Sequence, residues 1–305
     1  MDRVDLKAHL TAHIQEVARD RDPLFSPMGH LYVQTYIEGQ LSQWGEVERE
    51  EFDYSGQSYC NLYLDLPAQT DARRLKAQTS EPTLFQRPLS QRPLFQRPAI
   101  LIGAHYDAVH GSPGADDNAT GVAALLELAR SFAAVPAPYP IRLAAFDLEE
   151  YGRIGSLVSA QLAAEDGRAL RLMISLEMLG YCTQVAHSQT YPAPLDRIYP
   201  STGNFIALIG NLRTFPDLLA WQRRLKAGGT PCVILPIWNR GHPVPRTRDS
   251  DHSAFWDQGY NAIMVTDTAN LRNPHYHRGS DRPGTLDLDF LTRLTQGLID
   301  CLRNL

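Results

Sequence analysis

The chain is poor in cysteine. Only four of its 305 residues are cysteines, and they lie far apart without a Cys-x-x-Cys pair, at Cys60, Cys182, Cys232 and Cys301. Such sparse cysteines do not indicate a disulfide framework. We therefore expect no disulfides and a reducing compartment.

The sequence also lacks a long hydrophobic run. No stretch reaches the roughly 18 apolar residues that a membrane-spanning helix needs, and the most apolar helix candidate, 122–135, contains Glu127 and Arg130. The first residues alternate charged and apolar side chains and contain no apolar core of a secretory signal. We expect a cytoplasmic protein without a membrane partner.

Positive charge is not in excess. The chain has 29 Lys and Arg against 34 Asp and Glu, a formal net charge of -5. This balance argues against nucleic acid or an anionic membrane as the main partner. Hydrophobic residues make up 43% of the chain, which is enough for a substantial core and excludes disorder as the main state. We interpret residues 1–305 as a single domain.

The first third of the chain predicts two helices and a hairpin. Apolar residues follow helical spacing over 4–19, and a second helix is expected over 29–44. Two strands, 46–54 and 58–66, are separated by Ser55-Gly56. Residues 68–98 differ, because they are rich in Gln, Arg and Pro and repeat the triplet Gln-Arg-Pro every five residues. Proline disfavours helix in the residue before it, so we interpret this segment as an insertion or surface loop.

Beyond residue 98, short apolar runs alternate with helical patterns. One helix is predicted over 119–133, and the strand candidates are 99–104, 141–146, 172–176, 205–210, 232–237 and 262–266. Strands alternating with helices predict an α/β fold with a largely parallel sheet that is covered on both faces. Functional sites of such sheets lie beyond the carboxyl ends of the strands.

Metal-binding residue types gather at those predicted strand ends. They are His105 with Asp107, Asp116 with Asp117, Glu149 with Glu150, Glu177, and the group His275, His277 and Asp281. Each has an ordinary structural interpretation, such as a hydrogen-bonded histidine, a helix cap, a solvated glutamate pair or an ion-pair partner. A separate structural explanation for each residue is less credible because all of these residues are expected at the same edge of the sheet. Gathered carboxylates repel one another unless a cation neutralises them.

Imidazole and carboxylate donors without a thiolate fit zinc. Three carboxylates, those of Asp117, Glu150 and Glu177, together with a bridging hydroxide would balance the charge of two zinc ions. Glu149 is then free to act as a general base toward a metal-bridging water. Asp107 is expected to orient the imidazole of His105.

Five ordered segments resemble the co-catalytic, di-zinc aminopeptidases of the MH clan, which also includes glutamate carboxypeptidases and glutaminyl cyclases. They are GAHYD (103–107), PGADDNATG (113–121), DLEEYG (147–152), SDHSAFWDQGYNAIMVTDT (250–268) and NPHYHRGSD (273–281). The likeness runs from about residue 98 to 290. It implies a single α/β domain, the zinc exopeptidase fold, with a mixed, mostly parallel central sheet flanked by helices.

The resemblance also implies roles by position. The implied zinc ligands are His105, the bridging Asp117, Glu150, Glu177 and His277. Glu149 matches the general base, and Tyr276 is a candidate to hydrogen-bond the tetrahedral oxyanion. His277 is preferred to His275 because Asp281 follows it at the family spacing. Glu177 departs from the family, which usually has the shorter aspartate at this position.

Three positions keep two interpretations each. Asp251 either forms hydrogen bonds in the active site, as the aspartate of the matching loop does in the cyclases, or caps a helix that begins near Ser253. Arg246 and Arg248 either meet a substrate carboxylate or are solvated loop residues.

We expect a zinc-dependent aminopeptidase with two zinc ions, which hydrolyses N-terminal bonds of peptide or aminoacyl substrates. The first alternative is an aminoacyltransferase like the glutaminyl cyclases, with one zinc held by Asp117, Glu150 and His277. The second is a non-catalytic binding protein that keeps the fold, which is disfavoured because every implied ligand position holds a competent residue.

Overall fold

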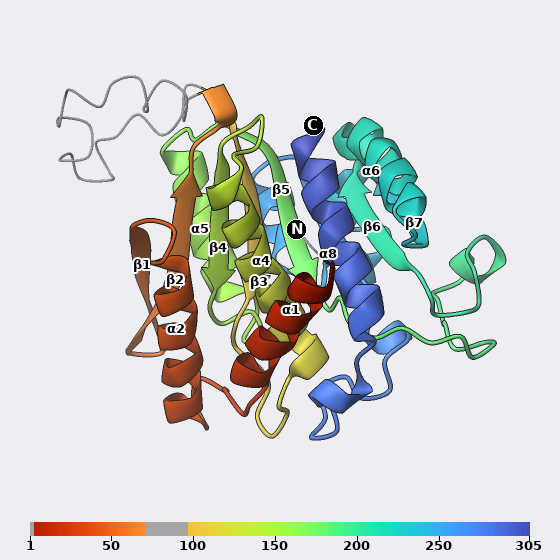
Figure 1. Cartoon of the computed structure of the whole chain (residues 1–305), viewed down its shortest axis with the longest axis horizontal. Coiled ribbons are helices and arrows are strands. Elements are labelled where there is room, and N and C mark those ends of the chain that lie inside the picture. The colour runs from red at the N-terminus through yellow and green to blue at the C-terminus, as the bar shows by residue number, and fades with distance from the viewer. Residues whose placement is uncertain (1–2, 71–96) are drawn as a thin grey trace.

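A computed structural model describes residues 3–70 and 97–305 of the chain. It contains an eight-stranded sheet with the strand order β1-β2-β4-β3-β5-β8-β6-β7 (Figure 1). The strands are β1 (Val47–Tyr54), β2 (Gln57–Leu66), β3 (Ala99–His105), β4 (Ile141–Phe146), β5 (Leu170–Glu177), β6 (Ile206–Asn211), β7 (Cys232–Ile237) and β8 (Ala262–Thr266).

Four adjacent strands in the middle of the sheet, β4, β3, β5 and β8, run parallel. Their carboxyl ends therefore meet at one edge, which is where the sequence places its metal-binding residues. The outer strands are mixed: the hairpin of β1 and β2 joins β4 antiparallel, and β6 joins β8 antiparallel while pairing parallel with β7.

Helices cover both faces of the sheet, as Figure 1 shows. Their bounds are α1 (Arg3–Val17), α2 (Pro27–Leu41), α4 (Gly121–Ala134), α5 (Ile154–Glu165), α6 (Phe215–Ala227), α7 (His252–Asp257) and α8 (Leu288–Arg303). The first core cluster takes its helical side chains from α1, α2, α4, α6 and α8 on one face. The second core cluster includes Ala160 of α5 and Phe255 of α7 on the other face.

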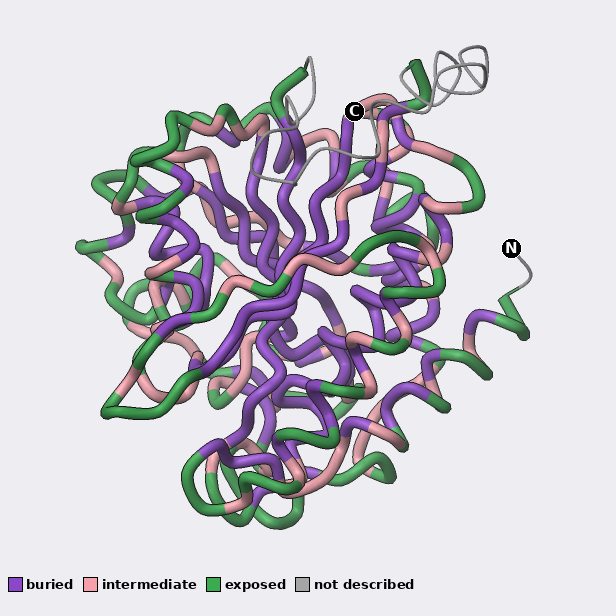
Figure 2. The backbone as a smooth tube through the Cα atoms, turned by 90° about the vertical axis from the view of Figure 1, so that its left-hand side faces the viewer, coloured by how far each residue is buried: buried purple, intermediate pink, exposed green. Residues whose placement is uncertain are grey.

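The centre of the sheet is fully buried. Every residue of β3 and β4 is buried, and Figure 2 shows the strands as a buried bundle surrounded by exposed loops. The continuous apolar runs of the sequence explain this, because a strand covered on both faces has no solvent side. The central α4 is buried along most of its length for the same reason.

The predicted fold class is confirmed. All eight strands lie within two residues of their predicted bounds. The second helix begins and ends earlier than the predicted 29–44, because Pro27 is the first residue of α2, a position that proline favours. Most of the predicted insertion at 68–98 lies outside the described residues. No helix among the described residues is long and apolar enough to cross a membrane.

Close packing at the middle of the sheet gives a first prediction. A Cβ added at Gly103 of β3 would lie 2.2 Å from Cε2 of Phe146 on β4. We expect Gly103→Ala to lower the free energy of unfolding by about 1–3 kcal/mol, because the aromatic ring must move within a packed core. Urea denaturation measures this difference.

The matched control is Gly39→Ala on α2, where an added Cβ meets nothing within 4 Å. We expect this variant to gain about 0.5–1 kcal/mol, since alanine favours helix over glycine. An equal effect of the two substitutions would show that contact with Phe146 is not the cause.

Candidate metal centre

Three ligand-type side chains meet where β3 and β5 end. His105 is the last residue of β3, Glu177 is the last residue of β5, and Asp117 lies in the irregular helical turn Ala115–Thr120 that precedes α4. The Nε2 atom of His105 lies 3.3 Å from Oδ1 of Asp117 and 3.7 Å from Oε1 of Glu177. One ligand atom from each of these residues lies within 4.8 Å of the other two, close enough for the three to bind one metal ion.

A second group shares Asp117 with the first. The Nε2 atom of His277, in the loop after β8, lies 3.2 Å from Oδ2 of Asp117 and 3.1 Å from Oε2 of Glu150. The two oxygens of Asp117 thus face different histidines, Oδ1 toward His105 and Oδ2 toward His277. This arrangement is what a carboxylate bridging two cations requires.

The donor set fits two zinc ions. Each group offers one imidazole nitrogen and two carboxylate oxygens, which are donors zinc accepts. His105 Nε2 and Glu150 Oε1 are buried and have no hydrogen-bond partner among the described residues. Buried polar atoms of this kind are costly unless something satisfies them. A bound cation at each group would satisfy both atoms.

The pKa values of the ligand side chains also indicate that the clustered carboxylates need cations nearby. Burial, and then repulsion from Asp117, raise the pKa of Glu150 to about 7. Burial lowers the pKa of His277, but hydrogen bonding to Asp117 and Glu150 outweighs it and raises that pKa to about 10. Without metal, the two histidines therefore act as the cations of the cluster.

Two further aspartates fix the backbone that carries the ligands. Asp107 lies 3.3 Å from Nδ1 of His105 and accepts hydrogen bonds from the backbone N–H groups of Glu149 and Glu150, at 3.0 and 3.1 Å. Asp281 accepts from the N–H groups of Asp116 and Asp117. Asp107 thus links the end of β3 to the loop after β4, as expected for a residue that orients His105.

Glu149 and Tyr276 line the cleft beside the two groups, together with Asp117, Glu150 and Glu177. Burial first, and then repulsion from Glu177 and Glu150, raise the pKa of Glu149 well above its ordinary value, while the positive charge of His105 opposes this rise. The ring of Tyr276 stacks on the imidazole of His277, with 3.7 Å between centroids.

The remaining predicted residues lie around this core. Asp251 is the N-cap residue of α7, but its side chain makes no capping hydrogen bond, and its two oxygens have no partner among the described residues. Burial raises its pKa to about 7. His275 belongs to neither ligand group and instead contacts Ser280. Arg248 pairs with Asp257, away from the cleft.

The sequence interpretation missed Arg21. Its guanidinium is fully buried and donates hydrogen bonds to the backbone oxygens of Tyr106, Pro113, Gly114 and Asp117. It also missed Ser250, whose hydroxyl donates to Oε2 of Glu177 at 2.8 Å. No local pattern marks either residue, since the partners that tie them to the site, Asp117 for Arg21 and Glu177 for Ser250, lie more than 70 positions away in the chain.

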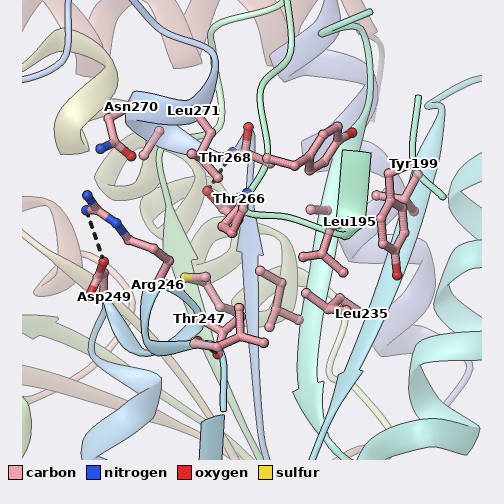
Figure 3. Close-up of a pocket in the computed structure, with 18 of the residues that line it drawn as sticks. Leu195, Tyr199, Leu235, Arg246, Thr247, Asp249, Thr266, Thr268, Asn270 and Leu271 are labelled. Carbon is pink, nitrogen blue, oxygen red and sulfur yellow. Dashed lines mark hydrogen bonds and ion pairs between the residues drawn. The ribbon is translucent and has the colours of Figure 1, made fainter. Parts of the chain in front are cut away.

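An apolar pocket adjoins the cleft (Figure 3). Tyr276 and Glu177 belong to the walls of both. The other walls come from β6, β7 and β8 and from the segment 191–199, and include Leu195, Tyr199, Phe205, Ile209, Leu235 and Met264. The pocket therefore offers an apolar side chain a place next to the predicted zinc ligands.

A family model described as Peptidase family M28 matches residues 89–211. This M28 match includes every predicted ligand except His277. Over this segment the chain is similar to peptidase family M28. The curated relatives include the uncharacterized protein YfbL of Escherichia coli K12, which is 38% identical over 218 residues, or 67% of this chain and 66% of YfbL. Aminopeptidase YwaD of Bacillus subtilis 168 is 37% identical over 98 residues, or 32% of this chain and 21% of YwaD.

The chain thus spans less than two thirds of the length of each of these relatives. Solved structures show the fold. LapA aminopeptidase of Legionella pneumophila has a TM-score of 0.65 at 15% identity, over 99% of this chain and 71% of LapA. Bacteroides thetaiotaomicron glutaminyl cyclase has the same TM-score, 0.65, at 16% identity, over 100% of this chain and 97% of the cyclase. Structural likeness alone therefore does not choose between peptidase and cyclase.

The pKa shifts of the histidines in the metal-free protein predict proton release on zinc binding. Although burial opposes it, hydrogen bonding to carboxylates raises the pKa of His105 well above its ordinary value and that of His277 to about 10, which favours the protonated imidazoles near pH 7. Zinc binds neutral imidazole, so we expect about two protons to leave the histidines on binding. Zinc affinity should then rise with pH between about 6 and 8, because fewer protons compete for the donors.

Calorimetric titration with zinc in buffers of different ionisation enthalpy measures the released protons. A binding enthalpy that does not depend on the buffer would contradict this prediction.

Proposed function

We propose that the protein is a two-zinc aminopeptidase that removes apolar residues from the N-termini of peptides. The observation that carries the proposal is the shared Asp117, whose two oxygens face the histidines of two separate ligand groups. The match of residues 89–211 to peptidase family M28 and the local similarity to an aminopeptidase support the reaction class.

His105, Asp117 and Glu177 would hold one zinc ion, and Asp117, Glu150 and His277 the other. Bound zinc supplies Lewis acidity, which polarises a carbonyl and makes water easier to ionise. Glu149 is the carboxylate of the cleft that belongs to neither ligand group. It accepts a proton from the attacking water and passes it to the leaving amine.

Tyr276 and the apolar pocket position the substrate. Tyr276 stands between the pocket and the cleft, and its hydroxyl donates a hydrogen bond to the oxygen of the tetrahedral intermediate. The side chain of the first substrate residue enters the pocket, which places the peptide bond that follows it beside Glu149. The free N-terminus then lies toward the carboxylates of the ligand groups.

A glutaminyl-cyclase-like activity is the alternative, because a cyclase shares the fold at the same TM-score as an aminopeptidase. It would need only the group formed by Asp117, Glu150 and His277. The group formed by His105, Asp117 and Glu177 favours the peptidase, since a one-zinc enzyme leaves these buried donors without a metal. Zinc counting, hydrolysis of leucyl peptides, and release of ammonia with pyroglutamyl formation from N-terminal glutaminyl peptides separate the two.

Glu149→Gln tests the proton transfer. We expect this variant to bind two zinc ions like the unaltered protein, while kcat for a leucyl peptide falls by about 10²–10⁴-fold, the usual contribution of a general base. Calorimetric zinc titration and peptide hydrolysis measure the two effects. A fully active variant would refute the role of Glu149.

His277→Ala tests the choice of ligand. We expect loss of one zinc ion per chain or a large fall in its affinity, because the variant leaves Asp117 and Glu150 without their third donor. The matched control is His275→Ala, two positions earlier, which should keep both ions because His275 lies outside both groups. Unchanged zinc content in the His277 variant would show that the ligand was assigned wrongly.

A further inference from the structure

The cleft beside the ligand groups contains two arginines, Arg153 and Arg246. All its other charged lining residues are carboxylates, those of Asp117, Glu149, Glu150, Glu177 and Asp249. Two zinc ions would neutralise the three ligand carboxylates. The two guanidinium groups belong to neither ligand group, and the proposed proton transfer does not use them, so their presence on the cleft wall calls for another explanation.

Arg153 is held next to the general base. Its backbone N–H donates to the carbonyl oxygen of Glu149 at 2.7 Å. Its φ is 64°, a left-handed conformation that is uncommon for a residue with a side chain. Among residues 3–70 and 97–305, no hydrogen bond or ion pair engages its guanidinium. The fold thus keeps an unpaired cation on the cleft wall.

Arg246 lies where the cleft meets the apolar pocket, since it lines both. Its side chain is 61% exposed and its only ion pair among the described residues is a loose one, at 3.6 Å to Asp249, which is 54% exposed. Figure 3 shows this pair on the side of the pocket away from Leu195, Tyr199 and Leu235. An exposed pair of this kind holds its partners weakly, so Arg246 is available to another carboxylate.

The proposed function sets the direction of a bound peptide. With the first side chain in the apolar pocket and the following peptide bond beside Glu149, the rest of the peptide continues along the cleft wall that carries Arg153. Guanidinium groups bind carboxylates through paired, charge-assisted hydrogen bonds. A carboxylate just beyond the cleaved bond would therefore meet these arginines.

Resting on the proposed function, we propose that Arg153, assisted by Arg246, binds a carboxylate on the leaving side of the cleaved bond. The substrate class is accordingly short peptides with an apolar first residue and a carboxylate close behind it. That carboxylate is either the C-terminus of a dipeptide or the side chain of an acidic second residue. The two sources share one chemistry and are separated by amidated peptides.

Binding without turnover gives the direct test. Zinc-loaded Glu149→Gln protein is titrated calorimetrically with Leu-Ala, Leu-Ala-amide, Leu-Asp-amide and Leu-Asn-amide. We expect Leu-Ala to bind at least about ten-fold more tightly than its amide, as for a hydrogen-bonded charge pair. Tighter binding of Leu-Asp-amide than of Leu-Asn-amide would extend recognition to an acidic side chain.

Substitution then assigns the preference to residues. Adding Arg153→Gln should remove most of the difference in affinity between Leu-Ala and its amide, and adding Arg246→Gln should remove a smaller part. Arg153→Lys keeps a positive charge and should retain some of the difference in affinity. The matched control is Arg168→Gln, because Arg168 pairs with Asp166 outside the cleft and should leave the preference unchanged. A preference that survives Arg153→Gln would overturn the assignment.

The inference would be overturned if Leu-Ala bound no more tightly than Leu-Ala-amide and Leu-Asp-amide no more tightly than Leu-Asn-amide. It would also be overturned if none of the four peptides bound. Hydrolysis of leucine p-nitroanilide, which has no carboxylate, by the unaltered zinc-loaded protein judges the proposed function separately. If the protein hydrolyses leucine p-nitroanilide but shows no preference for a carboxylate in the peptide titrations, the proposed aminopeptidase function stands and the proposed role of the arginines is rejected.

Discussion

The buried guanidinium of Arg21 makes the interactions on which the geometry of the candidate metal centre depends. It joins the end of α1 to the loop after β3 and to the turn that carries Asp117, through hydrogen bonds to backbone oxygens of all three. The turn is shaped around it: Gly114 has a φ of 57°, and a Cβ there would lie 2.8 Å from both terminal nitrogens of Arg21. The N-terminal helix is thus part of the support of the ligands.

Arg21 also offsets an unfavourable accumulation of charge. Burial lowers its pKa, while the carboxylates of Asp117, Asp107, Asp281 and Glu150 act in the opposite direction. Burial and mutual repulsion in turn raise the pKa of Glu149 and Glu150. Such a cluster is costly for stability and is retained where function needs it. The charged cluster is confined to one edge of the sheet, next to the fully buried strands β3 and β4.

The sequence predicted well whatever depends on local pattern. Continuous apolar runs predicted the strands because central strands are buried on both faces, and the carboxyl ends of those strands then predicted which residues would gather. The structure brings His105, Asp117, Glu150, Glu177 and His277 together as expected.

What the sequence did not predict depends on contacts between distant segments. Arg21 lies 85 positions from the carbonyl of Tyr106 that it binds, and its neighbours in sequence give no indication of this contact. The two interpretations of Asp251 were open for a similar reason: its position before α7 fits a helix cap, and only the three-dimensional structure shows that the side chain makes no cap. The position of Arg153 in the cleft was not predicted either, because a charged residue four positions after Glu149 is common in any sequence and does not indicate a binding site.

The division of the sheet explains why chemistry is easier to predict than specificity. His105 and Glu177 end parallel strands, and Asp117 and Glu150 lie in the loops that follow β3 and β4, so backbone geometry that is common to such sheets positions them. The apolar pocket instead takes its walls from β6, β7, β8 and the irregular segment 191–199, where β6 reverses the strand direction. The match to the family model ends at residue 211, before β7 begins. The family pattern therefore includes β6, the segment 191–199 and Arg153 but does not reach β7, β8 and Arg246, so the proposed substrate preference depends on side chains from both the matched and the unmatched parts of the chain.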